Sequence, residues 1–253
     1  MTTFTTETYK QLEDADLLKY GSFAVYELLR GDFNQEYTRK ETATRTTPAV
    51  FKDLLNPVDG QSKQAFIEQL NSNYIIYGLN WADAGSTEYG ELSDFHYVKE
   101  RDVTTGKSPR ANTKIVGLAK SVFNTPIANS FISDIVKGFP QTDSSKITRK
   151  SISQNKEVLN VSLEKMQQEL DIIKPKGLIF LHSRCEEIFT LFKEQGLVVP
   201  EGLKTITIYH YSGYTKNFMS LNRKKIFCFT DAIEHHHLID PFDSLYSVMN
   251  KSR

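Results

Sequence analysis

The chain of 253 residues contains only two cysteines, Cys185 and Cys228, and no CxxC pair. Two thiols cannot supply the four ligands of a cysteine-bound iron–sulfur cluster or zinc site, so we expect neither. The absence of a pairing pattern fits a reducing compartment, and we expect a cytoplasmic protein. Both cysteines are predicted to serve as small buried hydrophobic groups.

The chain also lacks a long apolar run and a net charge. Its N-terminus, MTTFTTETYKQLEDAD, has no basic start followed by an apolar core, so we expect no signal peptide and no membrane span. The 31 basic residues balance the 31 acidic residues. Composition therefore indicates neither a nucleic acid nor an acidic substrate, and a charged partner would have to meet a local patch.

Short apolar runs that alternate with helical patterns indicate the fold class. Four runs without a strong polar interruption are typical of strands buried in a parallel sheet: Tyr74–Tyr77, Phe131–Val136, Gly177–Leu181 and Thr205–Tyr209. Strands that alternate with helices favour a parallel sheet between two helical layers. We therefore predict an α/β fold, namely a three-layer α/β/α sandwich with a central four-stranded parallel sheet and extra helices at both termini.

Helical spacing and polar stretches divide the rest of the chain. Helices are predicted over Glu7–Leu29, Val50–Leu55, Ser62–Leu70, a segment from about Asn112, Asn155–Ile173, a segment from His182 to Gly196, and much of Lys216–Asn250. Loops are predicted over Gly31–Thr47, Ala82–Gly106 and Thr142–Ser153. The length fits one domain, with residues 1–60 as an N-terminal helical cap and loop, 73–218 as the core and 219–253 as C-terminal helices.

Polar side chains follow each of the four predicted strands. They are Asn80, then Asp134 with Lys137, then His182, then His210 with Ser212. Because the carboxyl ends of parallel strands meet at one edge of a sheet, we expect these groups to form a ligand site. Two plainer interpretations stay open: Asn80 and its neighbouring glycines suit an ordinary turn, and His182 suits the start of a helix.

Two of these strand exits resemble motifs of the uracil-DNA glycosylase superfamily, of which the chain looks like a divergent member. Its first motif takes forms such as G-x-N-P-G, and residues 78–81 read GLNW; its second is H-P-S followed by Gly or Pro, and residues 210–213 read HYSG. A less specific element, I-T-N-x-x-K, is similar to ISDIVK at 132–137. The resemblance covers about Asn73 to Phe218 and implies a four-stranded parallel sheet with catalytic loops at the strand ends.

The resemblance also implies an activity, base excision repair by a monofunctional DNA N-glycosylase without metal or other cofactor. Asn80 would orient the attacking water, and His210 would stabilise the departing base. The base, uracil or another damaged base in single- or double-stranded DNA, would be flipped into a pocket. The implied base-binding residues are Trp81, Tyr89, Phe95 and Asp134. The implied contacts to the DNA backbone are Lys137, Ser212, Gly213, Lys216 and Arg223. We expect a monomer.

Departures from the motifs leave other functions open. Trp81 and Tyr211 replace the two motif prolines, and Asp134 stands where several branches read uracil with an Asn. An ionised carboxylate accepts but does not donate hydrogen bonds, so it favours a base edge with donors. The alternatives are a catalytically silent nucleic-acid-binding relative, and an α/β enzyme that acts on a nucleotide or nucleoside small molecule.

Three consecutive histidines, His235–His237, invite a metal hypothesis. Adjacent side chains on a helix point about 100° apart, so these three cannot all bind one ion. We predict a solvent-facing run there.

Overall fold

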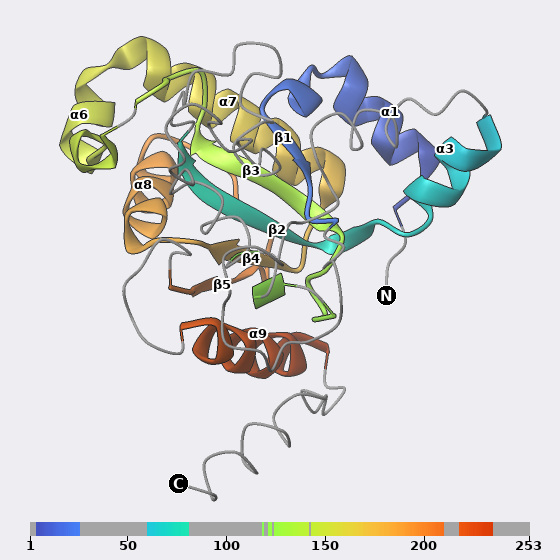
Figure 1. Cartoon of the computed structure of the whole chain (residues 1–253). Helices are drawn as coiled ribbons and strands as arrows, with labels where there is room; N and C mark the ends of the chain where they lie inside the picture. The colour runs from blue at the N-terminus through green and yellow to red at the C-terminus, as the bar shows by residue number, and fades with distance from the viewer. Residues whose placement is uncertain are drawn as a thin grey trace, which may run out of the picture.

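The computed structural model shows an α/β protein with a five-stranded mixed sheet and helices (Figure 1). It describes residues 4–25, 60–80, 118, 121–122, 124–141, 143–209 and 218–234; predicted segments elsewhere, including Val50–Leu55 and His235–His237, lie outside the described residues. The helices are α1 (Thr6–Asp14), α3 (Gly60–Ile67), α6 (Arg149–Gln154), α7 (Lys156–Ile173), α8 (Ser183–Glu194) and α9 (Phe218–Glu234), with short 3₁₀ turns η1 (Leu17–Lys19) and η3 (Ser144–Lys146). The strands are β1 (Gly21–Phe23), β2 (Asn71–Asn80), β3 (Ser130–Val136), β4 (Gly177–Phe180) and β5 (Lys204–Thr207).

The four predicted strands are confirmed as β2 to β5, and they run parallel in the order β3-β2-β4-β5. The register places one isoleucine of each strand in a row across the sheet: Ile132, Ile76, Ile179 and Ile206. β-Branched side chains pack well on a pleated surface, and this row belongs to the hydrophobic core on the α9 side. The four isoleucines are thus in register across all four parallel strands.

The fifth strand, β1, makes the sheet mixed, so the prediction of a purely parallel four-stranded sheet is wrong. β1 pairs antiparallel with β3 at the edge. One or two helices were expected over Glu7–Leu29, and α1 ends at Asp14. A Cβ on Gly21 would lie 2.5 Å from the Phe131 ring. The close approach of β1 to β3 therefore depends on the missing side chain at Gly21.

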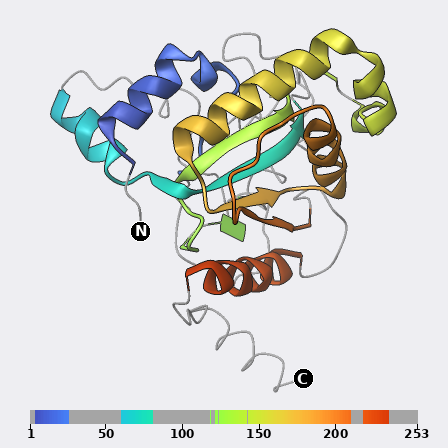
Figure 2. The ribbon, with the colours of Figure 1, turned by 180° about the vertical axis from the view of Figure 1, so that it is seen from behind.

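Helices cover both faces of the sheet, and each face has its own core. Figures 1 and 2 show α1, α7 and α8 on one side of the sheet and α9 on the other. Side chains alternate along β2: Tyr77 donates its hydroxyl to Glu169 of α7, whereas Tyr74 donates its hydroxyl to Glu234 of α9. The two residues thus tie the central strand to both helical layers.

Helix ends follow ordinary capping chemistry. Asn155 caps α7 by accepting a hydrogen bond from the Val158 backbone, and Lys174 ends this helix in the left-handed conformation. The predicted loop over Thr142–Ser153 is wrong in part, because a capping box of Thr148 and Ser151 starts α6 within it. Among the helices of the described ranges, none is long and apolar enough to cross a membrane.

The two cysteines differ in their surroundings. Cys185 is fully buried at the start of α8, as predicted, whereas Cys228 is exposed on α9. The buried polar residues of α9, Asn222 and Arg223, together with Ile226 and Thr230, define the face of this helix that packs on the sheet. Cys228 falls outside that face, so the prediction that it is buried is wrong.

Candidate functional site

The carboxyl ends of the four parallel strands lie side by side at one edge of the sheet, as predicted. Asn80, the last residue of β2, pairs in register with Val136, the last residue of β3. The next two strands end beside them, because the Leu181 backbone N–H donates to Tyr77 and the Ile208 N–H donates to Phe180. This edge is where open α/β sheets bind ligands.

The Asn80 side chain is held by the segment that follows β3. Its Nδ2 donates a 3.0 Å hydrogen bond to the backbone carbonyl of Gln141. This contact assigns the two arms of the amide, so the oxygen Oδ1 lies on the arm away from Gln141. An amide oxygen fixed in this way can accept a hydrogen bond from a water or a ligand, but it cannot act as a strong base.

Asp134 is buried on the neighbouring strand, with 2% of its surface exposed. It lies opposite Gly78 in the register, where β2 has no side chain. Ser133 faces α7, so strand alternation directs Asp134 toward the other face of the sheet.

Burial raises the pKa of the Cys185 thiol, and the charge of Asp134 raises this pKa further. Cys185 is therefore a neutral, inert thiol.

Lys137 and Arg223 are not at the surface, contrary to what a contact with DNA phosphates requires. Lys137 is 0% exposed and Arg223 is 1% exposed. The Lys137 ammonium is paired with Glu169 at 2.8 Å, and the Arg223 guanidinium lies 5.8 Å from the centre of the Phe227 ring. In this structure both cations belong to the interior, so the expected backbone contacts of these two residues are not supported.

His182 caps helix α8 at the exit of β4. Its Nδ1 accepts a 3.0 Å hydrogen bond from the Arg184 backbone N–H, which places the proton of the neutral ring on Nε2. Partial burial lowers the pKa of this imidazole, the Arg184 charge lowers it further, and Glu187 opposes the shift. The lowered pKa keeps the His182 imidazole uncharged at neutral pH.

The exit of β5 is fixed to helix α9 by a polar residue that the sequence analysis missed. Asn222 accepts a hydrogen bond from the Tyr209 N–H (2.8 Å) and donates one to the Tyr209 carbonyl (2.9 Å). Lys225 adds a 3.3 Å contact to the Thr207 carbonyl and lies 4.5 Å from the centre of the Tyr209 ring. The chain is thus anchored one residue before His210. The signal in the sequence was an Asn placed four residues before Ile226, on the apolar face of the helix.

Most of the expected aromatic and loop residues lie outside the described residues. They are Trp81, Tyr89, Phe95, His210, Ser212, Gly213 and Lys216. Of the expected site, the structure places Asn80 and Asp134 on the paired strands β2 and β3, and His182 two residues after the end of β4.

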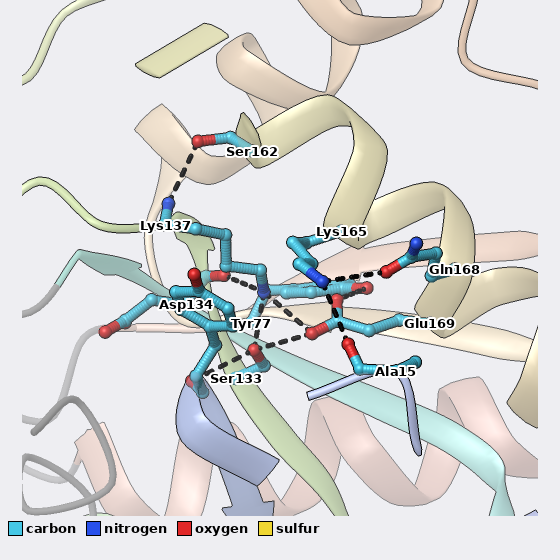
Figure 3. A network of polar contacts seen from close by, with 10 residues as sticks. Ala15, Tyr77, Ser133, Asp134, Lys137, Ser162, Lys165, Gln168 and Glu169 are labelled. Carbon is cyan, nitrogen blue, oxygen red and sulfur yellow. Dashed lines mark hydrogen bonds and ion pairs between the residues drawn. The ribbon is translucent and has the colours of Figure 1, made fainter. Parts of the chain in front are cut away.

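A buried polar network lies beneath this edge, on the α7 side of the sheet (Figure 3). Glu169 Oε1 accepts hydrogen bonds from Lys137 and from the Ser133 hydroxyl, both at 2.8 Å, and Oε2 accepts one from Tyr77 at 2.8 Å. Burial, followed by the Glu169 charge and hydrogen bond, raises the pKa of Tyr77 well above its ordinary value. Sequence reasoning missed Glu169, although it stands between Met166 and Leu170 on the inward face of α7.

Comparison of the chain with models of known protein families gave no match, and neither did comparison with curated proteins. Within the part of the chain that the structure describes, no group of three or more His, Cys, Asp or Glu side chains is placed to hold a metal ion.

Proposed function

We propose that the protein is a DNA glycosylase that hydrolyses the N-glycosidic bond of uracil or another damaged base in DNA. The observation that carries this proposal is the position of Asn80. Its amide is held by Gln141 at the edge of the sheet where β5 leads into His210. The parallel strands β2 to β5 support the proposal, since a four-stranded parallel arrangement is what the motif resemblance implies.

The reaction requires little from the protein beyond orientation and charge stabilisation. Water oxygen bonds to C1′ of the sugar, the C1′–N bond breaks, and the base leaves with the electron pair of that bond. Asn80 Oδ1 would accept a hydrogen bond from the water and so aim its lone pair at C1′. His210 would donate to the departing base or stabilise its negative charge. The water loses its proton to solvent after C1′ has been attacked.

The position of Asp134 supports a role for this residue in selecting the base. It is buried next to Gly78, where the missing side chain lets a ligand approach the sheet closely. Uracil, hypoxanthine and xanthine all carry a ring N–H that a carboxylate can accept. The aromatic residues Trp81, Tyr89 and Phe95 would provide the stacking surface for the flipped base.

The burial of Lys137 and Arg223 favours a second candidate function, an enzyme that acts on a nucleotide or nucleoside. A free nucleoside needs fewer phosphate contacts than a DNA strand, and two of the expected contacts lie in the interior. Under the first proposal the remaining contacts, Ser212, Gly213 and Lys216, must hold the DNA backbone. The catalytically silent nucleic-acid-binding relative would keep these contacts without turnover.

Formation of abasic sites tests the proposal. Oligonucleotides with uracil, hypoxanthine or xanthine, single- and double-stranded, are incubated with the protein and cleaved at abasic sites by alkali. Asn80→Ala should remove the product, whereas Asn73→Ala should not. Asn73 is a matched control because it lies on the same strand at the opposite end, where it donates to Glu234.

The outcomes separate the candidates. Product that depends on Asn80 establishes the glycosylase and names its base. Binding of DNA without product on any substrate indicates the silent relative. Absence of both, with release of a base from free nucleosides, indicates the small-molecule enzyme.

A further inference from the structure

Helix α7 holds one residue of β3's exit, Lys137, at two points. Ser162 Oγ accepts a 2.9 Å hydrogen bond from the Lys137 backbone N–H, and Glu169 Oε1 accepts a 2.8 Å hydrogen bond from its ammonium. Ser162 and Glu169 are seven residues apart, about two helical turns, and therefore lie on the same face of α7. Both are 0% exposed. The backbone and the side chain of Lys137 are thus fixed to a single rigid element (Figure 3).

The Lys137 ammonium uses all three of its donors inside the protein. Besides Glu169, it donates to the Ser133 hydroxyl at 2.5 Å and to the backbone carbonyl of Asp134. The side chains of Lys137 and Glu169 are both 0% exposed. A buried ion pair is often no more stabilising than apolar side chains of similar volume, so its presence is weak evidence for a role in stability.

The segment after Lys137 contains Gln141, whose backbone carbonyl binds the candidate catalytic residue Asn80. Gly138 turns the chain with φ +65°, and Phe139 packs against the core. Gln141, four residues after Lys137, then accepts the Asn80 Nδ2 hydrogen bond. The chain between the ion pair and this carbonyl is short and anchored, so a shift of Lys137 moves the group that orients Asn80.

We propose that Lys137 and Glu169 are positioning residues, whose ion pair fixes the exit of β3 so that the Gln141 carbonyl orients the Asn80 amide. The inference rests on the proposed function, because a fixed Asn80 amide affects turnover only if it orients the attacking water. Without the ion pair the β3 exit relaxes and the amide samples other orientations. Misplacement by about 1 Å can cost about 10²-fold in rate, even when the change lies away from the reacting atoms.

The double variant Lys137→Met/Glu169→Met tests positioning separately from folding. It replaces both buried charges with apolar side chains and leaves no unpaired ion. Because it also removes the acceptor of the buried Tyr77 hydroxyl, it should unfold at a lower urea concentration than the wild type while still folding. We expect kcat on the substrate found for the wild type to fall about 10²-fold, with KM and DNA affinity within about twofold. A double variant that folds and keeps the wild-type kcat overturns the proposal. The matched control is Glu13→Met/Lys63→Met, which removes a partly exposed ion pair of 3.2 Å at α1 and α3 and should change neither quantity.

A second measurement does not depend on activity. The side-chain amide of Asn80 gives a pair of signals in a ¹H–¹⁵N spectrum, which are assigned by their absence in Asn80→Ala. In the double variant these signals should shift from their wild-type positions, because the bond to Gln141 is lost. Unchanged signals overturn the positioning role whatever the activity. Signals that move in a protein without glycosylase activity leave the positioning intact and reject the proposed function.

Ser162→Ala decides the question if the double variant does not fold. This variant keeps the ion pair and removes only the acceptor for the Lys137 backbone N–H. It should shift the Asn80 signals in the same direction as the double variant and lower kcat about tenfold, with unchanged KM. Wild-type signals and kcat in this variant contradict the proposal.

Discussion

Asn222 and Tyr209 are joined by two hydrogen bonds, in which the amide of one side chain satisfies both the N–H and the C=O of one backbone residue. Asn222 is 1% exposed and Tyr209 is 42% exposed, so these two bonds are partly buried. Asn222→Ala should therefore lower the free energy of unfolding by about 1–3 kcal/mol, measured by urea denaturation. Because the anchor lies one residue before His210, turnover in the abasic-site assay should also fall about tenfold or more.

Asn222→Asp is the matched control for this anchor. A carboxylate still accepts from the Tyr209 N–H but cannot donate to its carbonyl. Because this carboxylate is buried and one of its oxygens faces the Tyr209 carbonyl oxygen, the loss of stability and of turnover should be at least as large as in Asn222→Ala. Equal turnover in all three proteins would show that the anchor does not position His210.

Removal of the side-chain hydroxyl should lower the free energy of unfolding by different amounts at the two β2 tyrosines, Tyr77 and Tyr74. Tyr77→Phe removes a donor from Glu169, which is fully buried, and should cost about 1.5–3 kcal/mol. Tyr74→Phe removes a donor from Glu234, which is only partly buried and keeps the hydrogen bond from Asn73. It should cost about 0.5–1.5 kcal/mol. Urea denaturation of both variants measures the difference, and a larger cost at Tyr74 would contradict the burial argument.

The lowered pKa of His182 predicts part of the pH dependence of stability. In the unfolded chain the imidazole titrates near its ordinary pKa of 6.5, and in the folded protein it titrates at a lower pH. Between these two values the unfolded state binds more protons, so stability rises with pH in this window. The contribution is complete above about pH 6.5 and is lost as the pH falls toward the folded pKa.

His182→Asn isolates this contribution. Asn is a good N-cap and does not titrate, so the variant keeps the acceptor for Arg184. Between pH 7 and pH 5 its free energy of unfolding should fall less than that of the wild type, by urea denaturation at each pH. Parallel curves for the two proteins would mean that His182 has an ordinary pKa in the fold.

The salt dependence of DNA binding tests which lysines contact phosphates. Lys137 is fully buried, so Lys137→Met/Glu169→Met should leave the slope of log affinity against log salt unchanged. Lys216→Ala should reduce this slope by about 0.7–0.9, the value for one lost phosphate contact. Fluorescence anisotropy with a labelled oligonucleotide at several salt concentrations measures both. A reduced slope for the double variant would mean that Lys137 reaches the DNA after all.

The parallel part of the fold was predictable because its strands are short apolar runs between clear helical patterns. The expected run at Phe131–Val136 became β3 almost unchanged, and Asn155–Ile173 became α7 with its cap. β1 was missed because a three-residue strand is too short to show alternation, and its apolar residues continued the helical spacing of α1. Only the close approach to Phe131 reveals why Gly21 is where it is.

The candidate site was predictable in its location but not in its supports. Strand order follows from the alternation of strands and helices, which places Asn80 and His182 at the same edge. The contact of Asn80 with Gln141 joins residues 61 positions apart, and no local pattern records it. From the sequence, Lys137 is expected at the surface, because its partner Glu169 lies 32 positions away and no local pattern identifies it. A charged residue at a strand exit can be buried in an ion pair or lie at the surface, and the sequence does not distinguish the two until its partner is known.

The central position of β2 has a consequence for folding kinetics. Asn80 meets Gln141 only after β2 has paired with β3, and parallel pairing must wait until the long connection between these strands has closed. Local helices such as α7 form on a much faster timescale than such a non-local contact. The arrangement of the candidate site is therefore acquired late, and a chain that is already rich in helix has no correctly oriented Asn80 until its innermost strands have come together.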